Sequence, residues 1–595
     1  MNNHLFLFTI GPVQSFIAQA RKTQDLYAGS QILSDLCRVG IEAIKSYRGK
    51  VIFPYESNKF LPNRFLAEIN QPESDLEKIG IEIEKKVKTE FKQQSEKVLN
   101  KYNIHKPPGF DEQIDNHLDI HWIFYPIKEN YSKAYREIER LLGAIKNTRT
   151  FEQLKDGAGE QGRKCSLDGE RNALFYRRNN QGKVPAFIQK DAVELKKETR
   201  RLHPNEALSA VSFVKRFYGS EEFTSITTVS LMNYMEQLEN AIKSNEDAKN
   251  ILDDKLLDKF GVKSIRDKKL ETGIFYEENL TSKYFREHDL DNYIKNDIPY
   301  IRECVIKLNK LATKTAYYAV LVFDADEMGQ WLSGNFLKNK DELKAFHLTL
   351  SEKLSSFADI AAKKLVYPCG QTIYAGGDDF LGFVNLDDLF EVIMSLRQCF
   401  DCLVNQPLKI FERQNENKNL TFSAGILIAH YKEPLHMVLQ EARRLEQVAK
   451  EEGGRDAFAM GVMKHSGESH QMCYKWKQGQ EWNIERLQYF IKQLQENFSD
   501  TFIRNLNLEL SALVEEDDKD EYHDIKNDER LFIEMKRLII RSVQEEHMKT
   551  KIVTPLNDIL SALWDSGKQS SHDKPKNFLD MLNIANFLVK KGYAK

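Results

Sequence analysis

The stretch that decides the fold is Ile373-Tyr374-Ala375-Gly376-Gly377-Asp378-Asp379-Phe380-Leu381-Gly382-Phe383. Two glycines and two adjacent carboxylates lie between short segments that favour β-strands. Because glycine tolerates positive φ, Gly376-Gly377 predicts the tight turn of a β-hairpin. Asp378 and Asp379 then project carboxylate oxygens from the turn, where a hard divalent cation can be held. A surface turn with solvated acids is the alternative interpretation, and this stretch alone does not decide between the two.

A second acidic segment upstream favours the metal site. Residues 316–323 (AYYAVLVF) form a continuous apolar run, long enough for a buried strand, which ends in Asp324-Ala325-Asp326. An acid at the exit of a buried strand is costly unless it is solvated or bound to a cation. Asp324 is therefore a candidate ligand. Asp326 fits either a ligand on the same face or a solvated or capping acid, because Gly329 indicates that the strand has already ended.

The order of predicted elements connects the two acidic segments. Helical periodicity over 341–365, 387–404 and 435–450 alternates with a hairpin over 371–384 and a strand over 420–429. The resulting order β-α-β-β-α-β-α fits a ferredoxin-like palm, in which the first strand and the hairpin are neighbours. That topology places Asp324 beside Asp378 and Asp379. Two Mg²⁺ ions bridging such carboxylates can activate a 3′-hydroxyl and stabilise a leaving pyrophosphate.

Further motifs, taken in chain order, resemble a known family. They are Thr9-Ile10-Gly11-Pro12-Val13-Gln14-Ser15-Phe16-Ile17, Leu61-Pro62-Asn63-Arg64-Phe65, Asp324-Ala325-Asp326-Glu327-Met328-Gly329, the Gly-Gly-Asp-Asp turn, Ser423-Ala424-Gly425-Ile426 and Gly453-Gly454-Arg455-Asp456. In this combination, from the N-terminus to about residue 460, the sequence resembles the large polymerase/cyclase subunit of type III CRISPR effector complexes, of the Cmr kind. Beyond residue 460 only a helical tail is recognisable.

The resemblance implies an enzyme that converts ATP into cyclic oligoadenylate second messengers when its complex binds target RNA. It implies that Asp324, Asp378 and Asp379 are catalytic ligands of Mg²⁺ or Mn²⁺. Gly376 and Gly377 would let the nucleotide approach. Lys450 matches a lysine that faces the nucleotide's phosphates, and a solvated helical lysine is the alternative.

The N-terminal region is expected to form a second palm without a Gly-Gly-Asp-Asp motif. The resemblance implies that it faces the catalytic palm and supplies nucleotide contacts from the segment containing Gly11, Ser30 and Ser34, while Ser423 contributes from the catalytic palm. From the sequence alone, these glycine and serine residues fit turn and cap positions equally well.

The expected fold class is therefore α+β, with two ferredoxin-like palm domains, a helical middle domain and a C-terminal helical domain. The expected domains are 1–155 (non-catalytic palm), 156–310 (helical, with a degenerate zinc-finger-like segment), 311–470 (catalytic palm) and 471–595 (helical). An acidic break at 515–521 interrupts the last domain and predicts an exposed loop. This domain is interpreted either as a docking domain for other subunits or as a self-contained bundle.

Two departures from the family change the expected chemistry. Where many members have cysteine pairs, this chain has Asp168, Ser209 and Ser212, with only Cys165 left, so we expect no structural zinc. The first strand begins at His4, so we expect no HD-type phosphohydrolase domain and no HD-type DNase activity. The His-Asp pairs at 288–289, 523–524 and 572–573 are scattered through polar segments and are interpreted as solvated.

Composition describes an ordinary multidomain globular protein of 595 residues, with 41% hydrophobic and 29% charged residues. No apolar run approaches the ~20 residues of a membrane span, and no signal peptide is evident. The seven dispersed cysteines fit a reduced, cytoplasmic protein. The net charge of −3 gives no global attraction to nucleic acid. The family resemblance implies other subunits, guide RNA and target RNA as partners through the complex, so guide pairing is expected to carry the sequence recognition.

Two other functions compete with the ATP-dependent enzyme. One is a catalytically idle scaffold of the ribonucleoprotein complex, which would not need adjacent acids. The other is a free-standing diguanylate cyclase, which would leave the segment from Gly11 to Ser34 and the helical tail unexplained. Turnover of ATP or of GTP distinguishes the two enzymes, whereas the size of the product ring cannot be derived from the residues.

Overall fold

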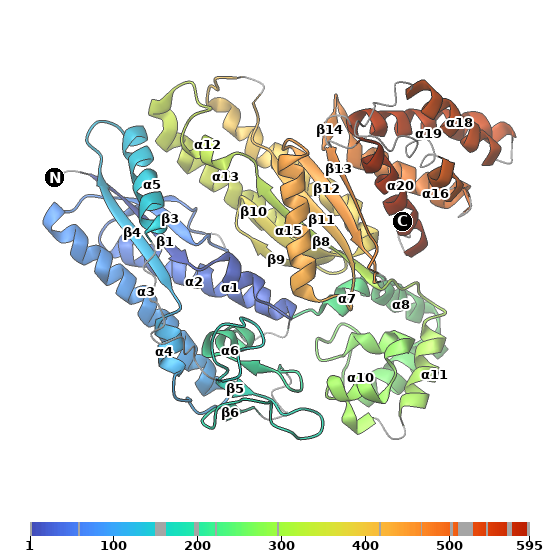
Figure 1. Ribbon diagram of the computed structural model, residues 1–595, viewed down its shortest axis with the longest axis horizontal. Helices are drawn as coiled ribbons and strands as arrows, with labels where there is room; N and C mark the ends of the chain where they lie inside the picture. Colours follow the sequence, from blue (N-terminus) through green and yellow to red (C-terminus); the bar gives the residue numbers. More distant parts are fainter. Residues whose placement is uncertain are drawn as a thin grey trace, which may run out of the picture.

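The computed structural model places an antiparallel sheet and a mixed sheet side by side, with the middle region below them and the C-terminal helices against the second sheet (Figure 1). It describes residues 3–57, 60–148, 162–195, 201–219, 223–293, 297–415, 418–465, 467–499, 502, 504–509, 528–542, 546–567 and 574–591. The predicted acidic break at 515–521 and the His-Asp pairs at 523–524 and 572–573 lie outside these residues. No helix within the described ranges has the length and hydropathy to span a bilayer.

The N-terminal sheet has the strand order β2-β3-β1-β4, the order of a ferredoxin-like palm. Its strands are β1 (His4–Gly11), β2 (Lys50–Phe53), β3 (Arg64–Ile69) and β4 (Asp119–Pro126). Alternation along β1 divides its side chains between two cores. Phe6 and Phe8 pack with α2 (Thr23–Ser46) and α3 (Glu73–Lys101), whereas Leu5 and Leu7 face the core that contains α5 (Tyr131–Asn147) and the second sheet.

The second sheet has the order β13-β12-β11-β8-β10-β9. Its strands are β8 (Tyr317–Ala325), β9 (Gly370–Ala375), β10 (Asp379–Val384), β11 (Phe422–His430), β12 (Ala457–Met463) and β13 (Ser469–Lys475). Helices α13 (Leu343–Lys364) and α14 (Leu389–Phe400) cover one face, and α15 (Leu435–Glu451) covers the other. Because β8 lies between β10 and β11, the predicted adjacency of strand and hairpin is confirmed.

The middle region was expected to be helical with a degenerate zinc-finger-like segment, and its first part forms a small sheet. Strands β5 (Phe175–Tyr176), β6 (Val193–Glu194) and β7 (Ala207–Leu208) pair in the order β6-β5-β7, and α6 (Ala210–Phe217) follows them. The second part is helical and has its own core. It includes α7 (Ile226–Ser230), α8 (Met232–Ser244), α10 (Ser282–Glu287) and α11 (Ile298–Leu308). Two-residue strands carry no readable periodicity, which explains why the sequence did not reveal them.

The C-terminal helices pack on the second sheet. They are α16 (Asn483–Asn497), α18 (Asp528–Ser542), α19 (Glu546–Gly567) and α20 (Lys574–Lys591). Asn577 of α20 accepts from the Cys473 amide at 2.7 Å and donates to the Cys473 carbonyl at 3.1 Å, which joins α20 to β13. The buried apolar residues of these helices belong to the core of the second sheet. Tyr489 of α16 and Ile533 and Ile540 of α18 are exposed.

Candidate functional site

Three aspartates meet at one edge of the second sheet. Asp324 on β8 is the direct antiparallel partner of Asp379 on β10. The amide of Ala325 donates to the carbonyl of Asp378 at 2.8 Å, so Asp378 is fixed beside the same strand end. The predicted candidate ligands Asp324, Asp378 and Asp379 are thus brought together by strand pairing. Within the described residues, no set of three His, Cys, Asp or Glu side chains is already arranged as a metal cage.

The turn between β9 and β10 requires glycine because its backbone adopts a positive φ and the adjacent side chains leave no room for a Cβ atom. Gly377 has φ +105°, and the amide of Gly376 donates to the carbonyl of Asp379 at 3.0 Å. A Cβ on Gly376 would lie 1.8 Å from Tyr374 Oη and 2.5 Å from Asp379 Oδ1. These glycines therefore allow the aspartates to be presented at a tightly packed turn.

The electrostatic environment of the three carboxylates opposes their ionisation. Asp378 is half-buried and Asp379 is exposed. Surrounding protein nevertheless reduces the hydration of both carboxylates. Loss of hydration and the Asp324 carboxylate raise the pKa of Asp378 to about 6. Loss of hydration, Asp378 and Asp324 together raise the pKa of Asp379 well above its usual range. Burial likewise raises the pKa of Asp324, although Lys450 opposes the shift.

Lys450 lies beside the acidic cluster, in the last turn of α15. Its ammonium group donates to Asp324 Oδ2 and lies 2.7 Å from Glu446 Oε1. Burial lowers the pKa of Lys450, but the two carboxylates outweigh burial and raise the pKa overall. Glu446 was not selected from the sequence, although it lies one helical turn before Lys450 and shares its face.

Asp326 and Ser423 occupy structural positions behind this edge. Asp326 is 2% exposed, and it accepts hydrogen bonds at 2.7 Å from both Thr421 Oγ1 and Ser423 Oγ. It also accepts from the Asp456 amide at 3.0 Å. Asp326 is therefore not the solvated or capping acid that the sequence allowed. It is a buried acceptor that joins the end of β8 to β11. Ser423 is the strand partner of Asp324, but its hydroxyl donates to Asp326.

The N-terminal palm contributes Arg64 to the site. Arg64 is the first residue of β3 and forms an ion pair with Glu139 of α5. The positive charge of Arg64 lowers the pKa of Asp378, whereas burial raises it. Phe60 contacts Tyr374 across the junction, with ring centroids 6.1 Å apart. Arg64 stood within a motif that carried the family resemblance, but its sequence did not indicate which carboxylate it would approach.

The other candidate residues of the N-terminal palm lie on β1 and α2. Gly11 ends β1 opposite Asp119. The hydroxyl of Ser34 accepts from the Leu61 amide at 2.7 Å, which attaches α2 to the loop before β3. Ser30 is buried on α2, and its Oγ has no hydrogen-bond partner among the described residues. Of the three, Ser30 alone thus has a hydroxyl with unused bonding capacity.

The segment with missing cysteines is organised around a carboxylate. Asp168 Oδ2 accepts from Ser209 Oγ at 2.6 Å and from Ser212 Oγ at 3.1 Å. Burial would raise the pKa of Asp168, but the bonds from Ser209 and from the amides of Glu170 and Arg171 outweigh it and lower the pKa. The residues that replace the expected thiolates thus bond to one another.

The described His-Asp pair at 288–289 is not arranged as a metal site. Asp289 accepts from Arg177 Nη1 at 2.9 Å, and His288 Nδ1 lies 3.1 Å from Glu271 Oε2. The two neighbours therefore have separate partners, and neither is free in solvent as the sequence suggested.

Comparison with known proteins agrees with this geometry. Residues 317–459 match the family model of the Cas10/Cmr2 second palm domain, and residues 5–101 match that of the N-terminal region of the CRISPR-associated protein Cmr2. Over these two ranges the chain is similar to the Cas10/Cmr2 family. The first match contains β8, the Gly-Gly-Asp-Asp turn and Lys450, and the second contains Ser30, Ser34 and Arg64.

Comparisons over most of the chain find similar proteins of the same kind. The chain is 25% identical over 575 residues to the CRISPR system Cmr subunit Cmr2 of Pyrococcus furiosus, with 80% of this chain and 63% of that protein covered. It therefore spans less than two thirds of the length of this relative. A type III-B Cmr-beta structure in the apo state shares the fold, with TM-score 0.64 and 13% identity over 100% of this chain and 82% of the other. The Cmr-beta structure bound to cognate target RNA gives the same TM-score and identity over 98% and 83%.

Proposed function

We propose that this chain is a nucleotidyltransferase of a type III RNA-guided complex, which joins ATP into cyclic oligoadenylate or a related adenylated messenger when target RNA binds. The observation that carries the proposal is the strand pairing of Asp324 with Asp379, which places three carboxylates and Lys450 at the junction of two palms. In the reaction, the 3′-hydroxyl of one ATP would attack the α-phosphorus of another, and pyrophosphate would leave. Other subunits, guide RNA and target RNA are proposed partners, as in the Cmr-beta complex bound to cognate target RNA.

The donor set fits a divalent metal. Besides burial, Asp324 raises the pKa of Asp378, and Asp378 and Asp324 raise the pKa of Asp379. The nearby cations that oppose the shifts are Lys450 at Asp324 and Arg64 at Asp378. Uncompensated carboxylate oxygens at a strand end are the ligands that Mg²⁺ or Mn²⁺ prefers. Asp324, Asp378 and Asp379 would hold the ion, which would supply Lewis-acid stabilisation of phosphoryl oxygens and lower the pKa of a bound hydroxyl.

The chain's own residues supply positioning and charge. Lys450 would exchange Asp324 for a phosphate oxygen, because a flexible ammonium group can move between two anionic partners. Arg64, approaching from the opposite palm, would bring a second positive charge toward the transferring group. The Gly376-Gly377 turn keeps the aspartate backbone close to the sheet, so the carboxylates remain oriented when a nucleotide enters.

The test combines the reconstituted complex with ATP, Mg²⁺ or Mn²⁺ and guide-matched RNA, and products are identified by mass. The Asp378→Ala/Asp379→Ala variant is compared with Asp253→Ala/Asp254→Ala, an adjacent pair in the middle region. A nucleotide product that requires RNA and is lost only in the first variant supports the proposal. If the wild-type complex binds target RNA but yields no product from ATP, the idle scaffold is the better description. Turnover of GTP in place of ATP would indicate a diguanylate cyclase.

A further inference from the structure

Tyr374 of β9 lies beside Asp379 on one face of the second sheet. Tyr374 is the strand partner of Leu381, which lies two residues beyond Asp379 on β10. Because residues two apart on a strand share a face, Tyr374 and Asp379 are diagonal neighbours, a separation that an aromatic side chain can bridge. A Cβ on Gly376 would overlap both the Tyr374 hydroxyl and Asp379 Oδ1, so the two groups lie over the same glycine.

The Tyr374 hydroxyl donates a hydrogen bond to the Asp379 carboxylate. Burial, Asp379 and Asp378 raise the pKa of Tyr374 well above its usual range, so the hydroxyl keeps its proton and acts as the donor. The bond favours the ionised form of Asp379, against burial and the charges of Asp378 and Asp324. A carboxylate has about four lone-pair directions, so Asp379 can accept this bond and still bind a metal ion.

Aromatic residues of the N-terminal palm hold the Tyr374 ring in place. Phe60 is 5% exposed and precedes β3, and its ring meets that of Tyr374 at an interplanar angle of 67°. On its other side, Phe60 packs edge-on against Tyr27 of α2, with ring centroids 5.9 Å apart. Helix α2 also contacts β9 directly. A series of aromatic contacts therefore runs from the N-terminal palm to a carboxylate of the acidic cluster.

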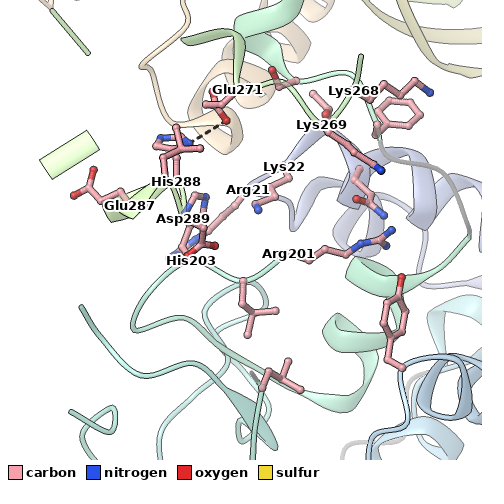
Figure 2. Close-up of a pocket in the computed structure, with 18 of the residues that line it drawn as sticks. Arg21, Lys22, Arg201, His203, Lys268, Lys269, Glu271, Glu287, His288 and Asp289 are labelled. Carbon is pink, nitrogen blue, oxygen red and sulfur yellow. Dashed lines mark hydrogen bonds and ion pairs between the residues drawn. The ribbon is translucent and has the colours of Figure 1, made fainter. Parts of the chain in front are cut away.

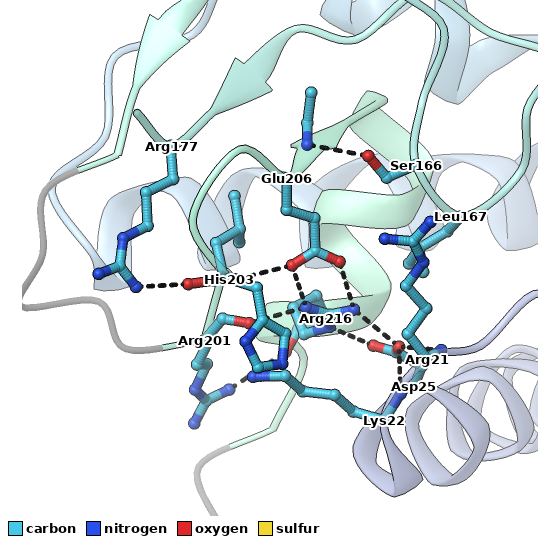
Figure 3. Close-up of polar contacts among 12 residues, drawn as sticks. Arg21, Lys22, Asp25, Ser166, Leu167, Arg177, Arg201, His203, Glu206 and Arg216 are labelled. Atoms are coloured by element: carbon cyan, nitrogen blue, oxygen red, sulfur yellow. Dashed lines mark hydrogen bonds and ion pairs between the residues drawn. The ribbon is translucent and has the colours of Figure 1, made fainter. Parts of the chain in front are cut away.

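The start of α2, which carries Tyr27, is anchored by a buried ionic cluster (Figure 3). Asp25 Oδ2 accepts a hydrogen bond from Arg216 Nη2 at 2.9 Å, and Arg216 Nη1 donates to Glu206 at 3.1 Å. All three side chains are buried. Separating buried opposite charges is costly, so this cluster resists displacement of the helix end that supports Phe60.

The middle region supports Tyr27 from the other side. Phe223 packs against Tyr27 with ring centroids 4.6 Å apart. Phe223 is also part of the lining of a cavity of about 1220 Å³, at which the side chains of Arg21 and Lys22 lie (Figure 2). The support behind Phe60 thus includes residues of two domains.

We propose that Tyr374 is a positioning residue for the acidic cluster: its hydroxyl fixes Asp379 in the orientation that binds a divalent metal ion, and Phe60 keeps the hydroxyl there. The inference rests on the proposed function, which assigns the metal to Asp324, Asp378 and Asp379. A hydrogen bond to a ligating carboxylate restricts its rotation, and loss of such a partner typically weakens metal binding by about 10–100-fold. The docking of the two palms thereby determines how tightly the cluster holds its metal.

The test titrates the full-length chain with Mn²⁺ alone, without ATP or RNA, and measures unbound Mn²⁺ by electron paramagnetic resonance. Tyr374→Phe removes the hydroxyl and keeps the ring. Tyr318→Phe is the matched control, because Tyr318 is a fully buried residue of β8 whose hydroxyl has no hydrogen-bond partner among the described residues. Asp379→Ala identifies the Mn²⁺ that belongs to the cluster. We expect Tyr374→Phe to bind this Mn²⁺ about tenfold more weakly and Tyr318→Phe to bind it as the wild type does.

Phe60→Leu tests the contribution of the N-terminal palm, since leucine keeps an apolar side chain but loses the ring contact. We expect a smaller loss of Mn²⁺ affinity than in Tyr374→Phe. Combining the two changes should give no further loss, because Phe60 acts through the Tyr374 hydroxyl. Additive losses would overturn this part of the inference. Thermal melting verifies that each variant folds.

Unchanged Mn²⁺ affinity in Tyr374→Phe, or equal losses in both tyrosine variants, would overturn the positioning role, because the hydroxyl would then only stabilise the fold. Tighter binding would overturn it as well, since the hydroxyl would then compete with the metal. A wild-type chain without any Mn²⁺ that Asp379→Ala releases would have the same consequence.

ATP turnover by the reconstituted complex is measured separately, so the two proposals can fail independently. Normal turnover with unchanged Mn²⁺ affinity in Tyr374→Phe would refute only the positioning role. Weakened Mn²⁺ binding in Tyr374→Phe, with no turnover by the wild-type complex, would support the positioning role and refute only the nucleotidyltransferase.

Discussion

Lys450 donates a charge-assisted hydrogen bond to Asp324, so the cation expected to face phosphate lies directly against an expected metal ligand. Glu446 holds the same ammonium group from one helical turn earlier. The lysine therefore has two anionic partners at the place where nucleotide phosphates would enter. This arrangement makes Lys450 part of the electrostatic balance of the acidic cluster.

Lys450→Ala is expected to lower RNA-dependent ATP turnover by about 10²-fold, because a positioned charge at the transferring phosphate is removed. Pyrophosphate release by the reconstituted complex measures the rate. Lys409→Ala, an exposed lysine of the same domain, serves as the control and should leave the rate unchanged. Equal rates for the two variants would mean that Lys450 does not act on the transferring phosphate.

Gly376→Ala is expected to reduce the free energy of unfolding by about 1–3 kcal/mol, because the new Cβ would overlap Tyr374 Oη and Asp379 Oδ1. Thermal melting of the isolated chain measures the change. Gly329→Ala on α12 (Met328–Leu332) meets open space and should be neutral or slightly stabilising. A melting temperature unaffected by Gly376→Ala would show that the turn relaxes without cost.

Ser30 and Ser34 should respond differently to replacement by alanine. Ser34→Ala leaves the buried Leu61 amide without this acceptor, which is expected to cost about 1–3 kcal/mol. Ser30→Ala removes a hydroxyl that has no described partner, so stability should stay the same or rise. Melting temperatures and ATP turnover are measured together. Loss of turnover in Ser30→Ala at unchanged stability would identify Ser30 as a nucleotide contact, whereas unchanged turnover would leave it a packing residue.

The stabilisation that the His470–Asp580 contact between β13 and α20 contributes should depend on pH. A hydrogen bond to Asp580 at 2.8 Å raises the pKa of His470 above its usual value, against the effect of burial and with help from Glu468. The folded state thus binds this proton more tightly than the unfolded state. The stabilisation is fully present below about pH 6.5 and is lost as the pH rises through the raised value. Comparing the melting temperatures of wild type and His470→Gln across this range should show a difference that shrinks toward alkaline pH. A constant difference would contradict the assignment.

The sequence predicted the acidic site because strand order follows from local patterns. The apolar run before Asp324 and the glycine turn before Asp379 defined two neighbouring strands, and the topology brought their ends together. The effect of Arg64 on Asp378 and the contact of Phe60 with Tyr374 were missed because they depend on how two palms dock, which no local periodicity encodes. The hydroxyl of Ser423 was expected to face a nucleotide, but Asp326 accepts its hydrogen bond. A sequence motif indicates that a residue matters without specifying its partner.

One continuous core includes Leu5 of β1, Phe323 of β8 and Leu588 of α20. Tyr317, the first residue of the strand that reaches Asp324, packs against Phe587 of α20, with ring centroids 4.8 Å apart. During synthesis, the strand carrying Asp324 therefore leaves the ribosome long before one of its packing partners exists. A chain interrupted before α20 would lack one wall of that strand, so an incomplete product would be poorly folded as well as shortened.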